Sequence, residues 1–366
     1  MKLGNQNVAI VHDWLTGTRG GERILETLCE LIPSATIFTL LHVPGSVSER
    51  IEENTIRASF VQRLPCVRRH YRLYLPLFPR AIESLDLSGY DLVISVSHCV
   101  AKAAIAPTGA LSVCICLTPM RYAWDQLDTY FPPERLVNRL IVRPILKRLR
   151  LWDEKTTHRA HHFVAISNFV AKRIEQYYGR ESEVIYPPVD VSRFTVDPDN
   201  VENYYLIVSA FAPYKRLDIA VEAFRALDAR LKIIGKGQEE RRLKATAPPN
   251  VEFLGSLPDE EVAVHLARCK ALLFCGVEDF GIVPLEALAS GRPVIAYAKG
   301  GALETIEDGK TGVLFHEQTP ESLIAAVRRA ETIQFDPSVL RRSAERFDVS
   351  IFKRRILEFI SEKMSE

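Results

Sequence analysis

Several features that would define other classes of protein are missing from this 366-residue sequence. Its 47 basic and 46 acidic residues leave a net charge of +1, without the basic field of a nucleic-acid-binding protein. No apolar run approaches the ~18 residues of a membrane-spanning helix. The N-terminus also lacks the hydrophobic region of a signal peptide. We therefore expect a cytoplasmic protein that binds no nucleic acid.

Metal-binding and disulfide patterns are also missing. None of the seven cysteines forms a CxxC pair, and several lie in apolar runs such as "LSVCICL". They are typical of buried thiols in a reducing compartment. The "HRAHH" stretch at 158–162 has histidines at ligand spacing, but no third ligand is assured. A cluster at a helix end is favoured, and no metal site is expected.

What the sequence does have is a regular alternation of apolar runs and helical patterns. Because the runs are rich in Val and Ile without alternating polarity, they predict parallel strands buried on both faces. Helices are predicted between them, including 21–31, 168–178, 216–228, 258–268 and 319–332. The predicted strands are 7–12, 35–41, 91–97, 111–117, 162–167, 183–186, 204–210, 230–235, 251–255, 271–275 and 293–297.

The alternation is interrupted once, by the proline-rich segment 187–200, which is a candidate linker. The pattern predicts an α/β protein of two doubly wound, Rossmann-like domains that face a cleft. Residues 1–190 would form the first domain and 191–345 the second. Residues 346–366 would form a C-terminal helix that crosses back to the first domain. Ligands are expected at the C-terminal strand ends, in that cleft.

The stretch "GVEDFGIVPLEALASGRPVIAY" (276–297) places carboxylates where apolar residues dominate. A strand ends before it, and Pro284 suits the first position of a short helix over 284–290. The backbone N–H groups at 280–283 would then attract an anion such as a phosphate. Glu278, in the loop, and Glu286, in the first helical turn, could accept hydrogen bonds from sugar or ribose hydroxyls. The alternatives are a solvated loop acid and an acid that favours the helix dipole.

The spacing of Glu278 and Glu286 resembles the E-x7-E motif of retaining GT-B glycosyltransferases of family 4. Other stretches resemble further motifs of that family, and they occur in the same order. They are "GTRGGER" (17–23), "YPPVDVSRF" (186–194), "SAFAPYKRLD" (209–218), "IIGKGQ" (233–238) and "GGALETIEDGKTGVLF" (300–315). The stretches "SHCVAKAA" and "LTPMRYAWD" are similar to a polysaccharide and O-antigen mannosyltransferase subgroup. The resemblance covers nearly the whole chain.

The resemblance implies that 1–190 is the acceptor-side domain and that 191–345 is the nucleotide-sugar-binding domain, and it implies roles for residues of the latter. Glu286 would bind the ribose of a nucleotide-sugar donor, and Glu278 would contact the transferred sugar. Amides of Phe280, Gly281 and Ile282 would hold sugar hydroxyls and the diphosphate. Lys215 would stabilise the leaving diphosphate, because negative charge develops on the diphosphate as the glycosidic bond breaks. An Arg usual in the family is replaced by Ala210, so Arg216 is the candidate second cation. No catalytic metal or cofactor is expected, since the family generally needs none and a DxD pattern is absent.

Candidates in the first half follow predicted strands. Gly20 and Gly21 do not form a dinucleotide fingerprint, but they can present amides to a donor phosphate or to the acceptor. His98, after strand 91–97, is the candidate catalytic histidine, and His12 is a weaker rival. Asp13, with His12, is a candidate acceptor-binding residue. Either histidine could instead be a polar residue bonded to backbone.

Two basic segments lie in the predicted acceptor domain. In 135–150, Arg135, Arg139, Arg143 and Lys147 form one ridge of a helix that Pro144 would kink. Segment 68–80 combines four arginines with aromatic and apolar residues. Both suit peripheral contact with the inner face of the cytoplasmic membrane, although packed helices with solvated charges remain the alternative.

These features favour a hexosyltransferase that moves mannose from GDP-mannose to a lipid-linked polysaccharide or O-antigen precursor, as in lipopolysaccharide synthesis. Three alternatives remain open. One is a transferase that uses dTDP-rhamnose or a UDP-sugar, and another is a GT-B sugar-nucleotide epimerase. The third is a non-catalytic GT-B binding protein, for which Ala210 is the only support.

Overall fold

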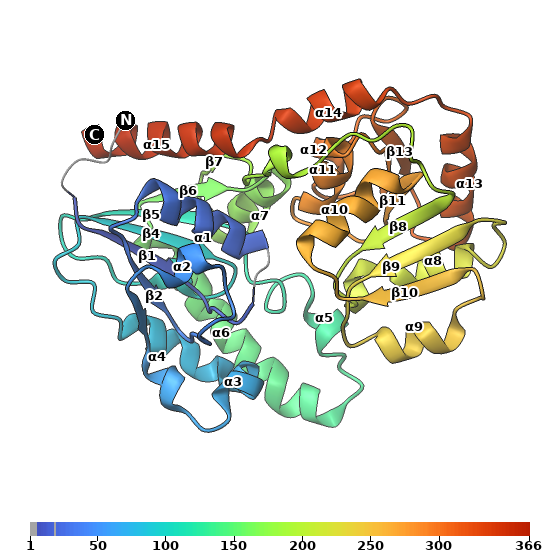
Figure 1. Ribbon diagram of the computed structural model, residues 1–366. Helices are drawn as coiled ribbons and strands as arrows, with labels where there is room; N and C mark the ends of the chain where they lie inside the picture. Colours follow the sequence, from blue (N-terminus) through green and yellow to red (C-terminus); the bar gives the residue numbers. More distant parts are fainter. Residues whose placement is uncertain (1–5, 18–19) are drawn as a thin grey trace. The chain divides into compact units, whose positions relative to one another are not determined.

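The computed structural model describes residues 6–17 and 20–366, which form two compact units (Figure 1). Unit 1 contains the chain up to Pro188 together with Ser350–Glu366, and unit 2 is Val189–Val349. Each unit contains one sheet, in which every paired strand is parallel to its neighbour. Hence the last segment of the chain folds with the first unit and not with the one that precedes it.

Unit 1 has a seven-stranded sheet with the order β3-β2-β1-β4-β5-β6-β7. The central strands are buried from end to end, as their uninterrupted apolar sequences predict. The seven strands are β1 (Val8–His12), β2 (Thr36–Thr39), β3 (Ile56–Ala58), β4 (Leu92–Ser97), β5 (Leu111–Cys116), β6 (His162–Ala165) and β7 (Glu183–Val184).

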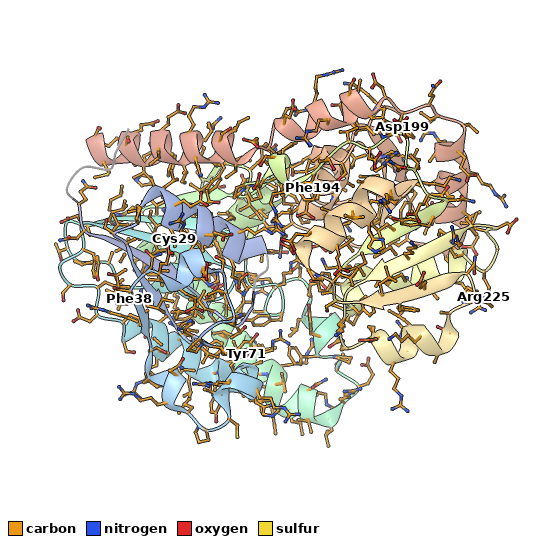
Figure 2. The ribbon with its side chains drawn as sticks, viewed as in Figure 1. Cys29, Phe38, Tyr71, Phe194, Asp199 and Arg225 are labelled. Carbon is orange, nitrogen blue, oxygen red and sulfur yellow. The ribbon has the colours of Figure 1, made fainter. Side chains whose placement is uncertain are left out.

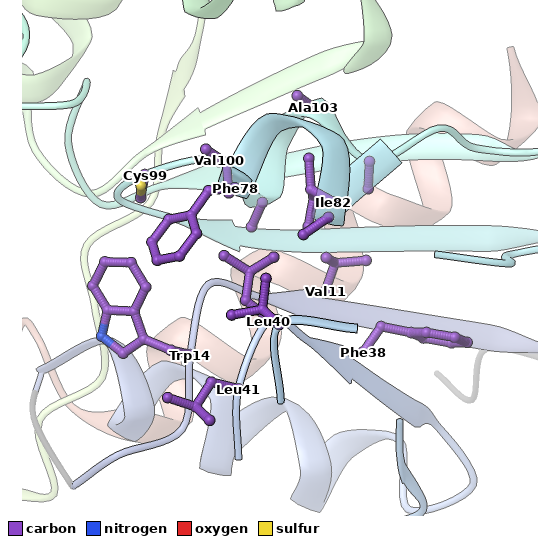
Figure 3. Packing of buried hydrophobic residues seen from close by; sticks show 14 of the residues in the cluster. Val11, Trp14, Phe38, Leu40, Leu41, Phe78, Ile82, Cys99, Val100 and Ala103 are labelled. Atoms are coloured by element: carbon purple, nitrogen blue, oxygen red, sulfur yellow. The ribbon is translucent and has the colours of Figure 1, made fainter. Parts of the chain in front are cut away.

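Helices cover both faces of this sheet. Side chains of β1, β2 and β4 form one cluster with Phe78 and Ile82 of α4 and Leu146 of α6, part of which Figure 3 shows. Figure 1 shows α1 on the opposite face. The helical segments are α1 (Gly20–Leu31), α2 (Glu49–Glu52), η1 (Phe60–Arg63), α3 (Val67–His70), η2 (Tyr71–Leu77), α4 (Phe78–Glu83), η3 (Ala101–Ala103), α5 (Leu127–Tyr130), η4 (Asn138–Val142), α6 (Arg143–Lys155), η5 (Thr157–Arg159) and α7 (Asn168–Tyr178).

Unit 2 repeats the design with six strands in the order β10-β9-β8-β11-β12-β13. They are β8 (Tyr204–Val208), β9 (Arg230–Ile234), β10 (Val251–Gly255), β11 (Ala271–Phe274), β12 (Val294–Tyr297) and β13 (Gly312–Phe315). The helical segments are η6 (Val191–Arg193), η7 (Pro213–Lys215), α8 (Leu217–Ala223), α9 (Glu240–Thr246), α10 (Asp259–Arg268), α11 (Ile282–Ala289), α12 (Ala302–Thr305), α13 (Pro320–Glu331) and α14 (Pro337–Glu345).

One cluster of the unit 2 core lies between its sheet and three helices. Apolar residues of α8, α9 and α13 cluster with Tyr205, Ile233 and Leu273 of the sheet. Figure 2 shows how densely side chains fill both units, with Phe38 in unit 1 and Phe194 in unit 2 among those labelled. The two sheets confirm the predicted pair of doubly wound, Rossmann-like domains.

The last helix, α15 (Val349–Ser365), packs on unit 1. Lys353 pairs with Glu30 of α1, and Arg355 pairs with Glu183 of β7. The Phe359 ring lies edge-on to His162, with centroids 6.2 Å apart. The predicted return of the C-terminal helix to the first domain is therefore observed.

Two local predictions were wrong, and a third took another form. First, Cys66 is exposed, whereas the other six cysteines are buried as expected. Second, α11 begins at Ile282, two residues before the predicted start. Third, Pro144 lies within a helical segment that runs from 136 to 155, and this segment departs from α-helical geometry in the π-helical turn η4 directly before the proline. A proline lacks the N–H that bonds to the preceding turn, and its ring clashes with that turn, so a wider π turn accommodates it.

No helix within residues 6–17 and 20–366 is both long enough and apolar enough to cross a membrane.

Candidate functional site

The candidate site in unit 2 lies where two neighbouring strands end. Lys215 follows β8, and Glu278 follows β11, which pairs with β8 in the sheet. The Nζ atom of Lys215 donates a hydrogen bond to Oε1 of Glu278, and both side chains are largely buried. The two residues that the sequence predicted for the diphosphate and the transferred sugar are thus in direct contact. In a buried pair, each charged group compensates the charge of the other.

Glycines allow the loops around this pair to pack backbone against backbone. A Cβ atom on Gly276 would lie 2.8 Å from Cα of Lys215. At Gly301 a Cβ atom would lie 2.2 Å from the carbonyl oxygen of Phe280, and the Gly301 N–H donates to the Glu278 carbonyl at 2.9 Å. The loop that carries Glu278 is therefore held between the Lys215 segment and the start of α12.

The N-terminus of α11 adjoins this loop. Gly281 is the N-cap residue, with a φ of 91° that side-chain-bearing residues rarely adopt. Because the helix begins at Ile282, Glu286 lies in its second turn, not in the first turn as predicted. Its side chain is buried, and its place in the second turn argues against the alternative of a first-turn acid that favours the helix dipole. Phe280 is buried too, and its ring lies 5.6 Å from that of Phe347.

Two arginines complete the charges near α11 and Lys215. Burial lowers the pKa of Arg193, but its hydrogen bond to Asp259 and the carboxylates of Asp259 and Glu286 outweigh burial, so the net pKa is raised. The negative charges of Asp259 and Glu286 therefore favour the charged form of Arg193. Arg216, the predicted second cation, instead directs its guanidinium group to Asp218, with Nε 3.1 Å from Oδ1. Its charge is already compensated in this structure.

The candidate residues of unit 1 also meet at adjacent strand ends. His12 is the last residue of β1, and Asp13 and Trp14 follow it. His98 follows β4, which pairs with β1 in the sheet. Asp13 is fully buried, and its carboxylate accepts four backbone N–H groups, those of residues 98–101, at 2.7–2.9 Å. The Asp13 oxygens are directed to this turn, and the binding of an acceptor hydroxyl by Asp13 stays a prediction.

His12 is also fully buried, and its Nδ1 lies 3.1 Å from the carbonyl oxygen of Trp14. Burial lowers the pKa of His12, so the ring is held neutral. It therefore resembles the alternative of a polar residue bonded to backbone. His98 is at the predicted strand end, and its side chain is partly exposed.

Gly20 and Gly21 open α1, as the sequence indicates. A Cβ atom on Gly21 would lie 2.7 Å from Leu117 and 3.5 Å from Nε2 of His12. Close packing is thus one physical reason for this glycine, and the donor-binding role of the pair stays a prediction. Residues 18 and 19 of the same predicted loop lie outside the described residues.

One buried ion pair was missed by the sequence analysis. Lys102 lies just after the 98–101 turn, and its Nζ is 3.1 Å from Oδ1 of Asp153 on α6. The other Asp153 oxygen accepts hydrogen bonds from Trp124 and Tyr178, at 2.8 and 2.9 Å. The lysine within the apolar stretch "CVAKAAIA" is the sequence signal for such a pair, whereas Asp153 lies in the charged stretch "KRLRLWDEK" and is 51 residues away, so the partner is hidden.

In the part of the chain that the structure describes, no group of three or more His, Cys, Asp or Glu side chains could hold a metal ion.

Two family models each match one half of the chain. Residues 18–193 match Glycosyltransferase Family 4, and residues 189–347 match Glycosyl transferases group 1. The chain carries two glycosyltransferase domains. The boundary between the two matches falls where unit 1 gives way to unit 2, so the site around Lys215 and Glu278 belongs to the group 1 domain.

Curated relatives of these glycosyltransferase domains include an uncharacterised glycosyltransferase from Methanocaldococcus jannaschii, 29% identical over 50% of this chain and 53% of the relative. The alpha-1,3/1,6-mannosyltransferase of Dictyostelium discoideum is 28% identical over 50% and 56%. A GDP-mannose-dependent alpha-(1-6)-phosphatidylinositol monomannoside mannosyltransferase of Mycolicibacterium smegmatis is 31% identical over 44% and 50%. The chain thus spans about half the length of the curated relatives it matches.

Solved structures share the fold over almost the whole chain. Anabaena HepE in complex with UDP-glucose has a TM-score of 0.71 at 19% identity, covering 97% of this chain and 99% of HepE. Sucrose-phosphate synthase from Thermosynechococcus elongatus has a TM-score of 0.75 at 16% identity, covering 99% and 100%. The two glycosyltransferase domains therefore have the GT-B fold.

Proposed function

We propose that this protein is a retaining glycosyltransferase that transfers a hexose to a lipid-linked polysaccharide precursor, with mannose from GDP-mannose as the favoured donor. The observation that carries the proposal is the contact between Lys215 and Glu278 beside the helix that bears Glu286. A cation for a leaving diphosphate and two carboxylates for hydroxyl groups are the groups that a nucleotide sugar requires. In the proposed complex, donor phosphate replaces Glu278 on Lys215, and the freed carboxylate accepts a sugar hydroxyl.

The reaction needs few residues in covalent roles. The bond between the anomeric carbon and the diphosphate oxygen breaks, and a bond from an acceptor hydroxyl forms on the same face. The hydroxyl proton passes to the leaving diphosphate, whose negative charge Lys215 stabilises. Glu286, supported by Arg193, holds the ribose, and His98 contacts the transferred sugar. Lys215 supplies the positive charge in this scheme, so turnover is expected to persist in excess EDTA.

Mannose is favoured because two of the relatives above are mannosyltransferases, one of them dependent on GDP-mannose. The HepE complex contains UDP-glucose, so a UDP-sugar is the leading competitor. A thermal-shift panel of GDP-, UDP- and dTDP-sugars tests the choice. A rise in melting temperature with GDP-mannose alone supports the proposal, and a rise with only UDP- or dTDP-sugars overturns the donor.

Variants of two residues test the site itself. Glu286→Ala and Lys215→Ala are expected to abolish turnover while the fold remains intact by circular dichroism. Glu286→Gln keeps the shape of the side chain, and Lys310→Ala removes a lysine from an exposed surface of the same unit as a matched control. Wild-type turnover in either alanine variant would refute the assignment. Product analysis distinguishes an epimerase, and calorimetry without nucleotide-sugar binding would favour a non-catalytic protein.

The acceptor side of the proposal rests on an apolar surface of unit 1, the 136–141 surface. It consists of Leu136, Val137, Leu140 and Ile141, whose side chains are between 56% and 62% exposed. Four large apolar residues exposed together are unusual outside an interaction site. Arg135, Arg139, Lys147 and Arg148 flank it and are exposed as well.

Basic and apolar side chains together suit the surface of an anionic membrane. In the second basic segment, Leu73 is 77% exposed between exposed arginines. Arg143 does not contribute, because it pairs with Asp128 at 2.6 Å. We therefore include peripheral binding to the cytoplasmic membrane face, where a lipid-linked acceptor would lie.

Cosedimentation with vesicles tests the membrane contact. Wild-type protein is expected to bind vesicles that contain phosphatidylglycerol and not vesicles of phosphatidylcholine alone. The double variant Leu140→Glu/Ile141→Glu should lose at least about tenfold in binding, since each apolar side chain contributes up to ~1.5–3 kcal/mol on burial. Val264→Glu, at an exposed position of α10, is the control. Equal losses of vesicle binding in both variants would contradict the proposal that the 136–141 surface binds the membrane.

A further inference from the structure

The turn that carries His98 is organised by one buried carboxylate. Oδ2 of Asp13 accepts the N–H groups of His98 and Cys99, and Oδ1 accepts those of Val100 and Ala101. Four such bonds are enough to satisfy a buried aspartate and to define the turn. A purely structural role would require nothing more of Asp13.

Asp13 nevertheless makes a fifth contact, with the imidazole ring of His98. Nδ1 of His98 lies 3.1 Å from Oδ2 of Asp13. The ring also lies edge-on to Trp14, with centroids 4.5 Å apart and an interplanar angle of 84°. Figure 3 shows Trp14 beside Phe78, near Cys99 and Val100 of the turn. A hydrogen-bond acceptor at one nitrogen and an aromatic ring on one side together define how the imidazole is oriented.

A carboxylate beside Nδ1 has a chemical consequence. A deprotonated carboxylate only accepts hydrogen bonds, so the proton of a neutral His98 resides on Nδ1. The lone pair then resides on Nε2, which becomes the nitrogen able to accept a proton or a hydroxyl hydrogen bond. We propose that Asp13 is a positioning residue for His98, which fixes the tautomer and direction of the ring so that Nε2 faces the substrate. This inference rests on the proposed function, in which His98 contacts the transferred sugar.

Asp153 provides a matched control for the structural part of this role. Lys102 directly follows the same turn, and its Nζ donates to the Asp153 carbonyl at 2.6 Å and pairs with the Asp153 carboxylate. Asp153 is as fully buried as Asp13. Its side chain contacts Lys102, Trp124 and Tyr178, and not the His98 ring. Both aspartates therefore stabilise one turn, but only Asp13 can set the tautomer of His98.

Nitrogen NMR of the histidine side chains tests the proposal on the wild-type protein, with His98→Gln used to assign the signal. We expect neutral His98 to carry its proton on Nδ1, which is the minor tautomer of free histidine. A neutral His98 protonated on Nε2 would overturn the proposal. This measurement needs no activity, so it remains decisive even if the protein transfers no sugar.

A double-mutant cycle on donor turnover tests the consequence. Asp13→Asn should lower kcat/KM of folded enzyme by about tenfold or more, part of the 10²–10⁴-fold that a positioned side chain contributes. In a His98→Gln background the same change should cost less than about twofold, because the ring it positions is gone. Asp153→Asn should cost the same factor in both backgrounds. Equal costs of Asp13→Asn with and without His98 would overturn the proposal.

Two further results distinguish failure of the positioning role from failure of the proposed function. If Asp13→Asn does not fold, Trp14→Phe replaces it in the cycle, and the NMR tautomer of the wild type still decides. If wild-type protein turns over no nucleotide sugar, the proposed function fails while the tautomer is tested independently. A neutral wild-type His98 without a proton on Nδ1, found together with intact turnover, would refute the positioning role alone.

Discussion

Replacement of Gly301 by alanine tests whether the Glu278 loop is a donor site. Gly301 has a φ of −62°, which alanine adopts without strain, so the substitution isolates the effect of one added methyl group. That Cβ atom would lie 2.2 Å from the Phe280 carbonyl oxygen, 2.3 Å from its Cα and 2.5 Å from its carbonyl carbon. All three are backbone atoms, so no side-chain rotation can relieve the contact.

The size of the effect follows from the displacement. Real Cβ contacts begin near 3.0 Å, so the 278–280 loop must move by about 0.8 Å. A misplacement of about 1 Å at a reacting centre costs on the order of 10²-fold in rate. We expect kcat/KM for the donor to fall by roughly that factor, equivalent to about 2.7 kcal/mol.

Steady-state assays with the best nucleotide sugar, together with thermal melts, check this prediction. Gly309→Ala is the control, because Gly309 has a φ of 77° but lies away from the Glu278 loop, with only the end of the Arg329 side chain within 4 Å. It should lose stability, by about 1–2 kcal/mol, and keep its activity. Wild-type kcat/KM in Gly301→Ala would refute the reasoning, and so would equal losses of activity in both variants.

Three further predictions concern stability. Burial lowers the pKa of His12, so on acidification the unfolded chain binds a proton at a higher pH than the folded protein does. The free energy of unfolding therefore falls as the pH drops below about 6.5. His12→Asn should reduce that slope by up to ~1.4 kcal/mol per pH unit in urea titrations, and an unchanged slope would contradict it. Phe352→Ala should cost about 3–5 kcal/mol, because the ring of this α15 residue is buried, whereas Lys353→Ala should cost far less. Thr319→Ala removes the N-cap of α13 and should cost about 1 kcal/mol in the same titrations, with no loss indicating that the cap is dispensable.

Buried parallel strands were the part of the fold that could be predicted best. Val8–His12 is buried at every position, and such a strand retains an uninterrupted apolar sequence. The prediction missed β3, Ile56–Ala58, because an edge strand of three residues with two exposed side chains carries little apolar signal. It also left β13 within a glycine-rich motif, since four residues are too few to show a period.

Parts of the candidate site were less accessible from the sequence. Strand-end positions could be predicted, but not which ends adjoin, so the Lys215–Glu278 contact across 63 residues was not foreseen. The position of Glu286 was misjudged by a turn, because the N-cap is a glycine in a left-handed conformation and not a residue before Pro284. Asp13 was assigned to the acceptor because nothing local reveals that its four donors lie 85–88 residues away.

The two ends of unit 2 have a consequence for how such proteins can be rearranged. Val189 donates to the Phe347 carbonyl, and Val349 donates to the Val189 carbonyl, so entry and exit of the unit form one short ladder. A module whose ends are already adjacent can be excised, exchanged between proteins, or circularly permuted without opening its sheet. Lys215, Glu278 and Glu286 would all travel with it. Under the proposed function, donor preference could therefore be transplanted as a single module, while unit 1 keeps both of its own segments.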